Sequence, residues 1–466
     1  MHSRRTNLKA KYIFLCSLSF LSILVSFASQ SRQHEQTVTS IAIDRVWSGH
    51  RIKPYLLTRG QQQFVAYYDA NRQMTVAHRQ LGGKWRYYKV DSWLGWDSHN
   101  YVTMELDSEG YLHVMGNMHA DPLEYFRMSE PLNVRSLKRV PVMAEKSLEK
   151  RMTYPVFLRN KQDQLIVKYR DGGSGNGSEI YNIYNTQSKS WSRLHANTFL
   201  DGEGKMSGYF EGPTLGPDGM FHLIWVWRNT PNAATNHSLS YAKSEDLINW
   251  QNSNGEDISL PITAKSAEVV DPVPPFGGMI NGNVKIGFDH NKQPIISYHK
   301  YDENGDTQVY VARKDGAAWK TVRISDWKGF RWDFGGHGSL GRFKVRPYAP
   351  ELLADNNIGV LVRRNDEVMR FILNQQSLET VSVEHADIYP PIINAAIKAA
   401  NPHYSFNKKA IKLESQVFEG KGDSSAFGKK FYLSWLNQPG NRDSAHPYIS
   451  QPSVLTLTGI DESQIK

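Results

Sequence analysis

The segment EGYLHVMGN (residues 109–117) places a Gly-containing turn before a short strand of alternating apolar residues that ends on a polar side chain. This order is typical of a half-buried β-strand that follows a tight turn. Six other segments repeat it: QQQFVAYYD (61–69), DQLIVKYRD (163–171), DGMFHLIWVW (218–227), KQPIISYHK (292–300), IGVLVRRND (358–366) and KKFYLSWLN (429–437). Seven copies of one turn and strand predict an all-β protein built from repeats.

The spacing of the repeats indicates how they are arranged. Their turns lie 48 to 74 residues apart, whereas a kelch or WD40 blade spans about 40–50 residues. We therefore predict a seven-bladed β-propeller, in which four-stranded blades with added loops surround a central channel. Four strand ends at Trp85, Trp191, Trp250 and Trp319 support the repeat, and SEDLINW before Trp250 resembles a degenerate Asp-box. A β-sandwich with extra domains is the alternative. Residues 392–400 are the main candidate for a short helix.

The N-terminus reads as an export signal. Four basic residues precede an apolar run over residues 12–25, and Ser26-Phe27-Ala28 resembles a cleavage site. We predict a signal peptide at 1–28 and one catalytic domain at 29–466, secreted or periplasmic. The apolar run is shorter than the roughly 20 residues of a membrane span, so no span is expected after signal removal. The only cysteine, Cys16, lies inside the signal.

Charge and composition limit the partners of the protein. The formal net charge is +9, of which the signal supplies four positive charges. The remaining Lys and Arg residues are scattered, whereas nucleic-acid binding usually needs a focused basic stripe. A mild excess of positive charge suits an anionic substrate through long-range steering. We expect a monomer that binds an anionic polysaccharide and no nucleic acid.

The repeat also predicts which polar residues converge. In a blade, the start of the first strand and the end of the second lie on the same face, so residues at these ends should share one rim. His and Tyr can transfer protons there, and Arg can bind a carboxylate. The residues that fall at such ends are His99, Asn100, His119, Tyr154, Arg170, Tyr209, Arg228 and His299. Glu211 is the main acidic residue of this rim.

Metal and phosphate sites receive little support. His299, His337 and Asp271 could form part of a structural metal site, but their spacing is not a metal-binding motif. The Gly-rich segment 172–177 is not followed by a helical pattern, so it is a flexible loop rather than a phosphate cradle.

The rim residues carry a resemblance to a known group. The segments SHNYVTMELDSEGYLHVMGNMH from Ser98, TYPVFLRN and KYRDGGSGNG resemble the propeller polysaccharide lyases that act on ulvan, families 24 and 25. That group has two histidines about twenty residues apart, then a tyrosine, then an arginine sixteen residues later. Here His99 and His119 are 20 apart, and Tyr154 and Arg170 are 16 apart. The spacing is closer to family 25. Some members carry a structural metal with a cysteine ligand, which the mature chain lacks.

The resemblance implies cleavage of ulvan by β-elimination at the uronic acid next to sulfated rhamnose, giving 4,5-unsaturated uronate ends. Arg170 would neutralise the carboxylate with help from His119, and His99 and Tyr154 would act as acid and base in an order left open. Asn100, Tyr209, Arg228 and His299 would bind substrate, and catalysis would need no metal or organic cofactor. Two alternatives remain: a propeller glycoside hydrolase of the rhamnosidase or sialidase type, and a non-catalytic carbohydrate-binding propeller.

Overall fold

The computed structural model describes residues 38–400, 413–423 and 428–464, so the predicted signal peptide at 1–28 lies outside the described residues. The described chain is almost entirely β-structure, which confirms the predicted all-β class. One α-helix, α2 (Pro391–Ala400), occurs where the sequence predicted a short helix. No helix among the described residues is long and apolar enough to cross a membrane.

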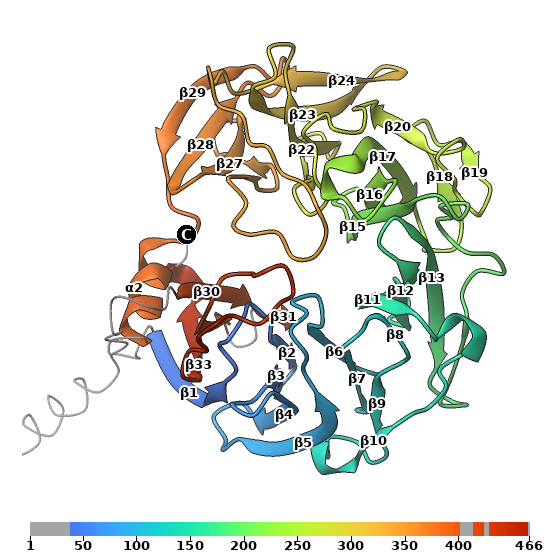
Figure 1. Cartoon of the computed structure of the whole chain (residues 1–466), viewed down its shortest axis with the longest axis vertical. Helices are drawn as coiled ribbons and strands as arrows, with labels where there is room; N and C mark the ends of the chain where they lie inside the picture. The colour runs from blue at the N-terminus through green and yellow to red at the C-terminus, as the bar shows by residue number, and fades with distance from the viewer. Residues whose placement is uncertain (1–37, 401–412, 424–427, 465–466) are drawn as a thin grey trace, which may run out of the picture.

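Within the described residues the strands form seven sheets that follow one another around a common centre (Figure 1). The first four sheets along the chain contain these strands: β2 (Tyr55–Arg59), β3 (Gln62–Tyr68), β4 (Gln73–Gln80), β5 (Arg86–Trp93) and β31 (Lys421–Gly422); β6 (Val102–Leu106), β7 (Leu112–Gly116), β9 (Tyr125–Met128) and β10 (Leu137–Arg139); β8 (His119–Asp121), β11 (Met152–Arg159), β12 (Leu165–Gly173), β13 (Asn176–Asn185) and β14 (Ser190–Arg193); β15 (Ser207–Leu215), β16 (Phe221–Arg228), β17 (Asn236–Ser244), β18 (Trp250–Gln251), β19 (Asp257–Ile258) and β20 (Glu268–Asp271).

The other three sheets follow in chain order, apart from β1. They contain β21 (Lys285–Phe288), β22 (Pro294–Tyr301), β23 (Thr307–Asp315) and β24 (Ala318–Arg323); β25 (Val345–Pro347), β26 (Glu351–Leu352), β27 (Ile358–Arg364), β28 (Glu367–Leu373) and β29 (Thr380–His385); β1 (Val38–Val46), β30 (Glu414–Glu419), β32 (Lys429–Asn437) and β33 (Ser453–Asp461). In the last sheet β1 pairs antiparallel with β33, with Val38 opposite Ile460. The two ends of the described chain are therefore joined in one sheet.

Each of the seven sequence repeats lies in a different sheet. The strands that they form are β3, β7, β12, β16, β22, β27 and β32. Their alternating residues pack against the neighbouring sheet on either side, and the apolar clusters lie between consecutive sheets. Leu57 and Phe64 pack with Val102 and Met104 of the next sheet, for example. Each such side chain stabilises the fold by about 1.5–3 kcal/mol when fully buried.

The helix α2 packs against the seventh sheet, on its strands β1 and β33. Ile393 of this helix packs against Tyr432 and Ile460 of the sheet that joins the two chain ends. In Figure 1, β2, β6, β11 and β15 lie toward the centre of the ring, whereas β5, β10 and β24 lie outside. Loops that enter or leave the inner strands therefore converge near the centre, and the site described next lies on these loops.

Candidate active site

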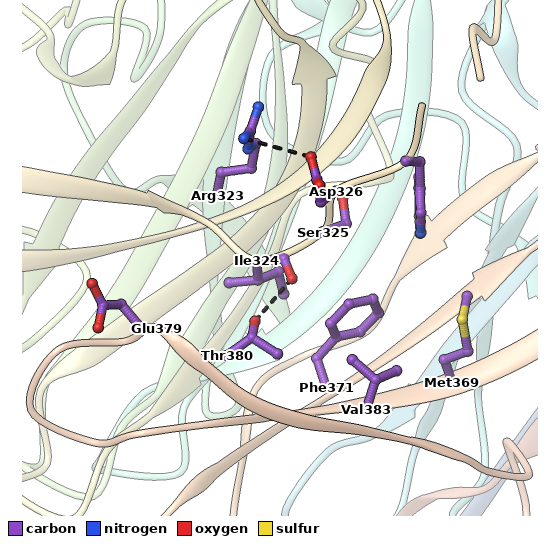
Figure 2. A pocket seen from close by; sticks show the side chains of 10 residues that line it. Arg323, Ile324, Ser325, Asp326, Met369, Phe371, Glu379, Thr380 and Val383 are labelled. Carbon is purple, nitrogen blue, oxygen red and sulfur yellow. Dashed lines mark hydrogen bonds and ion pairs between the residues drawn. The ribbon is translucent and has the colours of Figure 1, made fainter. Parts of the chain in front are cut away.

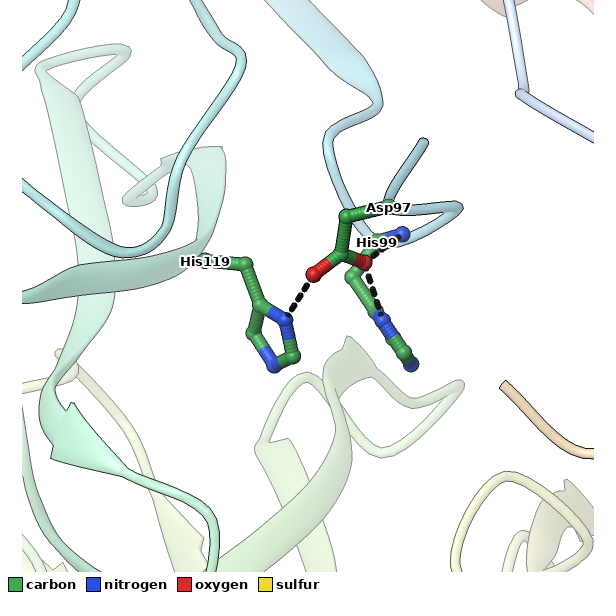
Figure 3. A group of neighbouring side chains, drawn as sticks. All are labelled: Asp97, His99 and His119. Atoms are coloured by element: carbon green, nitrogen blue, oxygen red, sulfur yellow. Dashed lines mark hydrogen bonds and ion pairs between the residues drawn. The ribbon is translucent and has the colours of Figure 1, made fainter. Parts of the chain in front are cut away.

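Asp97 links two histidines from different sheets. Asp97 and His99 belong to the loop between β5 and β6, and His119 begins β8. Nδ1 of His99 donates to Oδ1 of Asp97 at 2.6 Å, and Nδ1 of His119 donates to Oδ2 at 2.5 Å. The two imidazole centroids lie 4.3 Å apart. A carboxylate only accepts hydrogen bonds, so both Nδ1 atoms carry protons. Both Nε2 atoms then face away from the carboxylate (Figure 3).

The charge of Asp97 is maintained by these contacts. Burial opposes its ionisation, but the hydrogen bonds from His119 and His99 outweigh burial and hold the pKa of Asp97 below its usual range. A second carboxylate oxygen, from Asp443, lies 3.7 Å from Nδ1 of His99. The site therefore contains an ionised carboxylate that fixes the orientation and the tautomer of two histidines.

His119 reaches the site by a different path from the one expected. The sequence suggested that the returning strand of the second repeat ends at His119, but β7 ends at Gly116. The chain then crosses to the next sheet, where His119 pairs with Thr153 of β11. Asn117 and Ala120, on either side, have positive φ angles of 60° and 63°. This crossing places His119 beside Tyr154, the neighbour of Thr153.

Tyr154 lies at an irregularity in β11. The pairing of β11 with β12 shifts between Thr153 and Val156, and Tyr154 has a φ of 54°. A non-glycine residue in this region costs about 1–3 kcal/mol and is often found at functional sites. The Tyr154 ring centroid lies 5.8 Å from the rings of both His99 and His119. Burial and the nearby Tyr209 raise the pKa of Tyr154 well above its usual range, although Arg170 and Arg228 act in the opposite direction.

Arg170 lies beneath two tyrosine rings. Its guanidinium carbon is 5.0 Å from the Tyr154 ring centroid and 5.3 Å from that of Tyr209. The residue is 2% exposed, and its three guanidinium nitrogens have no hydrogen-bond partner among the described residues. The covered nitrogens do not face solvent, so a direct fork of Arg170 on a substrate carboxylate stays a prediction. The charge of Arg170 acts on Tyr154, whose pKa it lowers.

The remaining predicted residues divide into two groups. Arg228 lies near the cluster: its guanidinium carbon is 5.3 Å from the Tyr209 ring, and Nε donates to the Thr230 carbonyl. Its Nη2 contacts the Pro231 carbonyl, whereas Nη1 makes no hydrogen bond to the described residues. Tyr209 is 6% exposed and its hydroxyl bonds to Ser174, so it supports the cluster from below.

Asn100 and His299 hold structure rather than face the site. Asn100 is buried, and its Nδ2 donates to Asn117 at 3.1 Å, which fixes the two loops together. His299 is 1% exposed, contacts Asn283 through Nε2 at 3.0 Å and packs against Trp332. Burial lowers the pKa of His299 to about 3. The structure therefore does not bring His299 into the cluster, because β22 carries it into the core of a later sheet.

The suggested metal group of His299, His337 and Asp271 does not form either. Asp271 instead contacts Lys300 at 2.6 Å and the hydroxyl of Tyr298. Among the described residues the one group of three side chains close enough to hold a metal ion is Asp97, His99 and His119. Ligands at 2.0–2.2 Å from a zinc ion would be separated from each other by roughly 3 Å or more. The observed N···O distances of 2.5 and 2.6 Å fit hydrogen bonds better than shared coordination.

Two hollows in the described part of the chain differ in their relation to this cluster. One, of about 450 Å³, lies between β24 and the strands β28 and β29, and its lining includes Ile324, Phe371 and Val383 (Figure 2). Arg323 and Asp326 in its wall pair with each other at 3.6 Å, and Glu379 is the one further charged residue of its lining, so it lacks a cluster of acid–base groups. The other, of about 280 Å³, includes His99 and Tyr101 in its wall. The second hollow therefore adjoins the cluster of histidines and tyrosines.

The chain is similar to a known family of repeat proteins. Residues 62–327, more than half of the chain, match the profile described as "BNR repeat-containing family member". The chain belongs to the BNR repeat-containing family. Within this BNR-repeat chain the segment that resembles an Asp-box forms a closed turn, in which Ser244 Oγ accepts from the Leu247 backbone at 2.8 Å and Trp250 is buried. A comparison with curated protein sequences finds no match.

Solved structures similar to this BNR-repeat chain agree with the resemblance seen in the sequence. The polysaccharide lyase Uly1 aligns with a TM-score of 0.60 at 14% identity, over 91% of this chain and 99% of that one. The PL25 ulvan lyase aligns with a TM-score of 0.57 at 13% identity, over 91% and 96%. A structure of that enzyme bound to -[GlcA(1-4)Rha3S]- gives the same values. At such identities the likeness shows a shared fold.

In this BNR-repeat chain, Asp97 is a site residue that was not predicted from the sequence. The signal was present, since Asp97 stands two residues before His99, a spacing at which an Asp side chain can bond to the backbone ahead of it. It does so: Oδ1 of Asp97 also accepts from the backbone nitrogen of His99 at 2.9 Å. The contact with His119 could not be derived from spacing, because it depends on the crossing between two sheets.

Proposed function

We propose that this chain is an exported ulvan lyase whose seven sheets are the blades of a closed seven-bladed β-propeller. It would cleave ulvan by β-elimination at the uronate next to sulfated rhamnose and leave a 4,5-unsaturated uronate. The observation that carries the proposal is the grouping of His99, His119 and Tyr154 around Asp97, with ring centroids 4.3 to 5.8 Å apart. The fold shared with polysaccharide lyases supports it, as does the N-terminal segment that resembles an export signal.

The acid–base order can be argued from the contacts of each group. Because Asp97 holds a proton on Nδ1 of His99, the neutral imidazole has its lone pair on Nε2 and can accept the C5 proton of the uronate. Tyr154 keeps its hydroxyl proton, since its pKa lies above the usual range. It can therefore donate that proton to the O4 leaving group as the C4–O4 bond breaks. We assign His99 as the base and Tyr154 as the acid.

Two arginines then have different roles. The guanidinium of Arg170 lies beneath the Tyr154 ring, so it stabilises the negative charge that forms on Tyr154 when the proton leaves. Removal of the C5 proton also requires that the uronate carboxylate be neutralised. Arg228, whose Nη1 makes no hydrogen bond to a described residue, is the cation left for that task. No step requires a metal ion or an organic cofactor in this proposal.

A two-carboxylate hydrolase receives less support. Such an enzyme needs paired Asp or Glu side chains facing one sugar. Glu211 contacts Nζ of Lys285, and Glu179 is buried, where burial raises its pKa to about 8. The carboxylate inside the cluster, Asp97, is occupied by both histidines. Incubation with ulvan separates the proposals: a lyase produces ultraviolet absorbance from the conjugated uronate, a hydrolase produces saturated ends, and a binding protein produces neither.

A further inference from the structure

The hollow beside His99 is strongly cationic. Its wall carries five basic side chains, Arg51, Lys53, Arg342, Arg346 and Arg363, and one acidic side chain, Glu414. These residues come from widely separated segments: Arg51 and Lys53 precede β2, Arg346 lies in β25 and Arg363 in β27. Only the fold brings them together. Like charges gathered in this way repel one another unless an anion lies between them.

Two of the five cations are already occupied. Arg342 forms an ion pair with Asp366 through Nη1. Arg363 donates to the backbone carbonyls of Asn365 at 2.7 Å and Phe343 at 3.0 Å, so it holds the loop that forms one wall. These interactions account for Arg342 and Arg363 without a bound ligand. Of the other three, Lys53 and Arg346 lie over the rings of Phe418 and Phe343, at 4.1 and 5.6 Å from the centroids, which holds these side chains but leaves their charges without a counter-ion.

Glu414, the one acidic side chain in the wall of the hollow, acts on Arg51 without forming an ion pair with it. Among the residues that the structure describes, no carboxylate lies within ion-pair distance of Arg51, Lys53 or Arg346. Nε of Arg346 is buried and makes no hydrogen bond to a described residue. Water reaches Arg51 and Lys53, yet the surrounding protein reduces the solvent around each charge. Burial and the charge of Arg346 lower the pKa of Arg51, and burial lowers the pKa of Lys53 to about 8.

The position of the hollow indicates what would fill it. His99 and Tyr101 form part of the wall, and Tyr101 stacks parallel to Tyr154 at 6.5 Å. A polysaccharide whose uronate lies against His99 and Tyr154 would therefore place an adjoining sugar at the hollow. Asp443 fixes this entrance, because its carboxylate accepts from Ser98 on one wall at 3.2 Å and from Ser339 on the other at 2.8 Å.

We propose that Arg51, Lys53 and Arg346 form an oxyanion subsite that binds the sulfate ester of the sugar next to the cleaved uronate. This inference rests on the proposed lyase function and names the part of the substrate that the site recognises beyond the uronate. Guanidinium groups suit a sulfate because their planar forks donate two parallel hydrogen bonds. The three cations would discriminate sulfated from unsulfated chains rather than take part in bond breaking.

The test compares native and chemically desulfated ulvan as substrates of the full chain. Arg51→Gln and the double variant Arg51→Gln/Arg346→Gln should raise KM on native ulvan by roughly 10- to 100-fold, as expected when hydrogen bonds to a charged group are lost. kcat should change little, and on desulfated ulvan variant and wild type should have the same KM. Arg342→Gln is the matched control, because its guanidinium is paired with Asp366; it should leave KM unchanged. Arg51 is exposed, so its variant should fold if the double variant does not.

Two results would overturn the subsite. The variants could have the same KM as wild type on native ulvan. Alternatively, their KM could rise equally on native and desulfated ulvan, which would assign the cations to a uronate carboxylate. Calorimetric binding of native and desulfated ulvan fragments to wild type and Arg51→Gln keeps this test separate from the lyase proposal. If wild type forms no unsaturated product but prefers sulfated fragments and Arg51→Gln does not, the subsite stands and the lyase assignment falls.

Discussion

His119 donates a 2.5 Å hydrogen bond from Nδ1 to the Asp97 carboxylate, across the boundary between two sheets. The other carboxylate oxygen accepts from His99. One carboxylate thus fixes the tautomers of two imidazoles that approach from different directions. The account of the site depends on this arrangement, since only a histidine with its proton on Nδ1 presents a free lone pair on Nε2.

Asp97→Asn should lower kcat on ulvan by roughly 10²-fold or more, as loss of a general base does. An asparagine has one accepting oxygen and one donating amide, so one of the two histidines would face a donor and carry its proton on Nε2 instead. KM should change far less than kcat. The check is steady-state kinetics with thermal unfolding to establish that the variant folds.

Asp121→Asn provides the matched control for this variant. Asp121 is a carboxylate beside His119, but it accepts from the His119 backbone nitrogen at 2.9 Å rather than from the ring. Its amide can keep that contact, so kcat should stay near wild type. Equal losses in both variants would show that general charge, not tautomer control, is what Asp97 supplies.

Tyr154→Phe should lower kcat by about two to four decades, as removal of a general acid does. The ring remains and should keep its packing against the histidines and Arg170, so KM should rise little. Single-turnover kinetics with bound ulvan isolate the chemical step. A variant that binds weakly but turns over bound ulvan at the wild-type rate would make Tyr154 a packing surface only.

Arg170 should act through Tyr154. Arg170→Met fills a similar volume without charge and should lower kcat by roughly 10²- to 10³-fold, as loss of one preorganised electrostatic group does. In the Tyr154→Phe background the same change should cost almost nothing further, because no phenolate forms there. A double-mutant cycle measures this. Additive losses would mean that Arg170 contacts the substrate independently of Tyr154.

Stability should fall on acidification through three buried histidines. Burial lowers the pKa of His50 and His78 to about 4 and that of His299 to about 3. Each histidine takes up a proton near pH 6.5 in the unfolded chain but stays neutral in the folded chain. The free energy of unfolding is therefore unaffected by these groups above that pH and falls below it. At pH 5 each histidine should lower the free energy of unfolding by about 2 kcal/mol.

His299→Gln isolates one of these contributions, since Gln keeps a polar atom for Asn283 without a titrating ring. Urea unfolding measures the drop in the free energy of unfolding from pH 7 to pH 5. This drop should be smaller in the variant than in wild type by about 2 kcal/mol, the contribution of one histidine. Asp97 does not change the slope between pH 5 and 7. Because its pKa is lowered in the folded chain, it stabilises the fold at pH values above its pKa in the unfolded chain, and this stabilisation is lost only at more acidic pH. An unchanged slope in the variant would contradict the prediction.

The features of the fold and the site that could be predicted from the sequence are those that depend on local contacts. The β-class and the seven strands follow from alternating residues after turns, and each repeat occupies its own sheet. The strand ends also indicated His99, His119, Tyr154 and Arg170, which do gather. His299 fits the same rule, but its strand carries it inward against Trp332. The depth of a residue within a sheet depends on the neighbouring sheets, which strand periodicity does not encode.

The contacts that spacing could not predict are those between sheets. The crossing of His119 to β11, the cover of tyrosine rings over Arg170 and the cationic hollow all join segments far apart in the chain. Arg51 and Arg346, for example, are separated by most of the sequence and lie in one wall only after folding. Such residues carry no local motif, so a repeat pattern alone does not reveal them.

β-Elimination and hydrolysis leave different chain ends, so the chemical nature of the new ends distinguishes the two reactions. Purified full chain is incubated with ulvan, ultraviolet absorbance is followed, and the products are analysed by mass spectrometry. The account predicts rising absorbance and oligosaccharides that end in a 4,5-unsaturated uronate, each lacking one water relative to a hydrolysis product. Saturated oligosaccharides with new reducing ends and no absorbance change would contradict it.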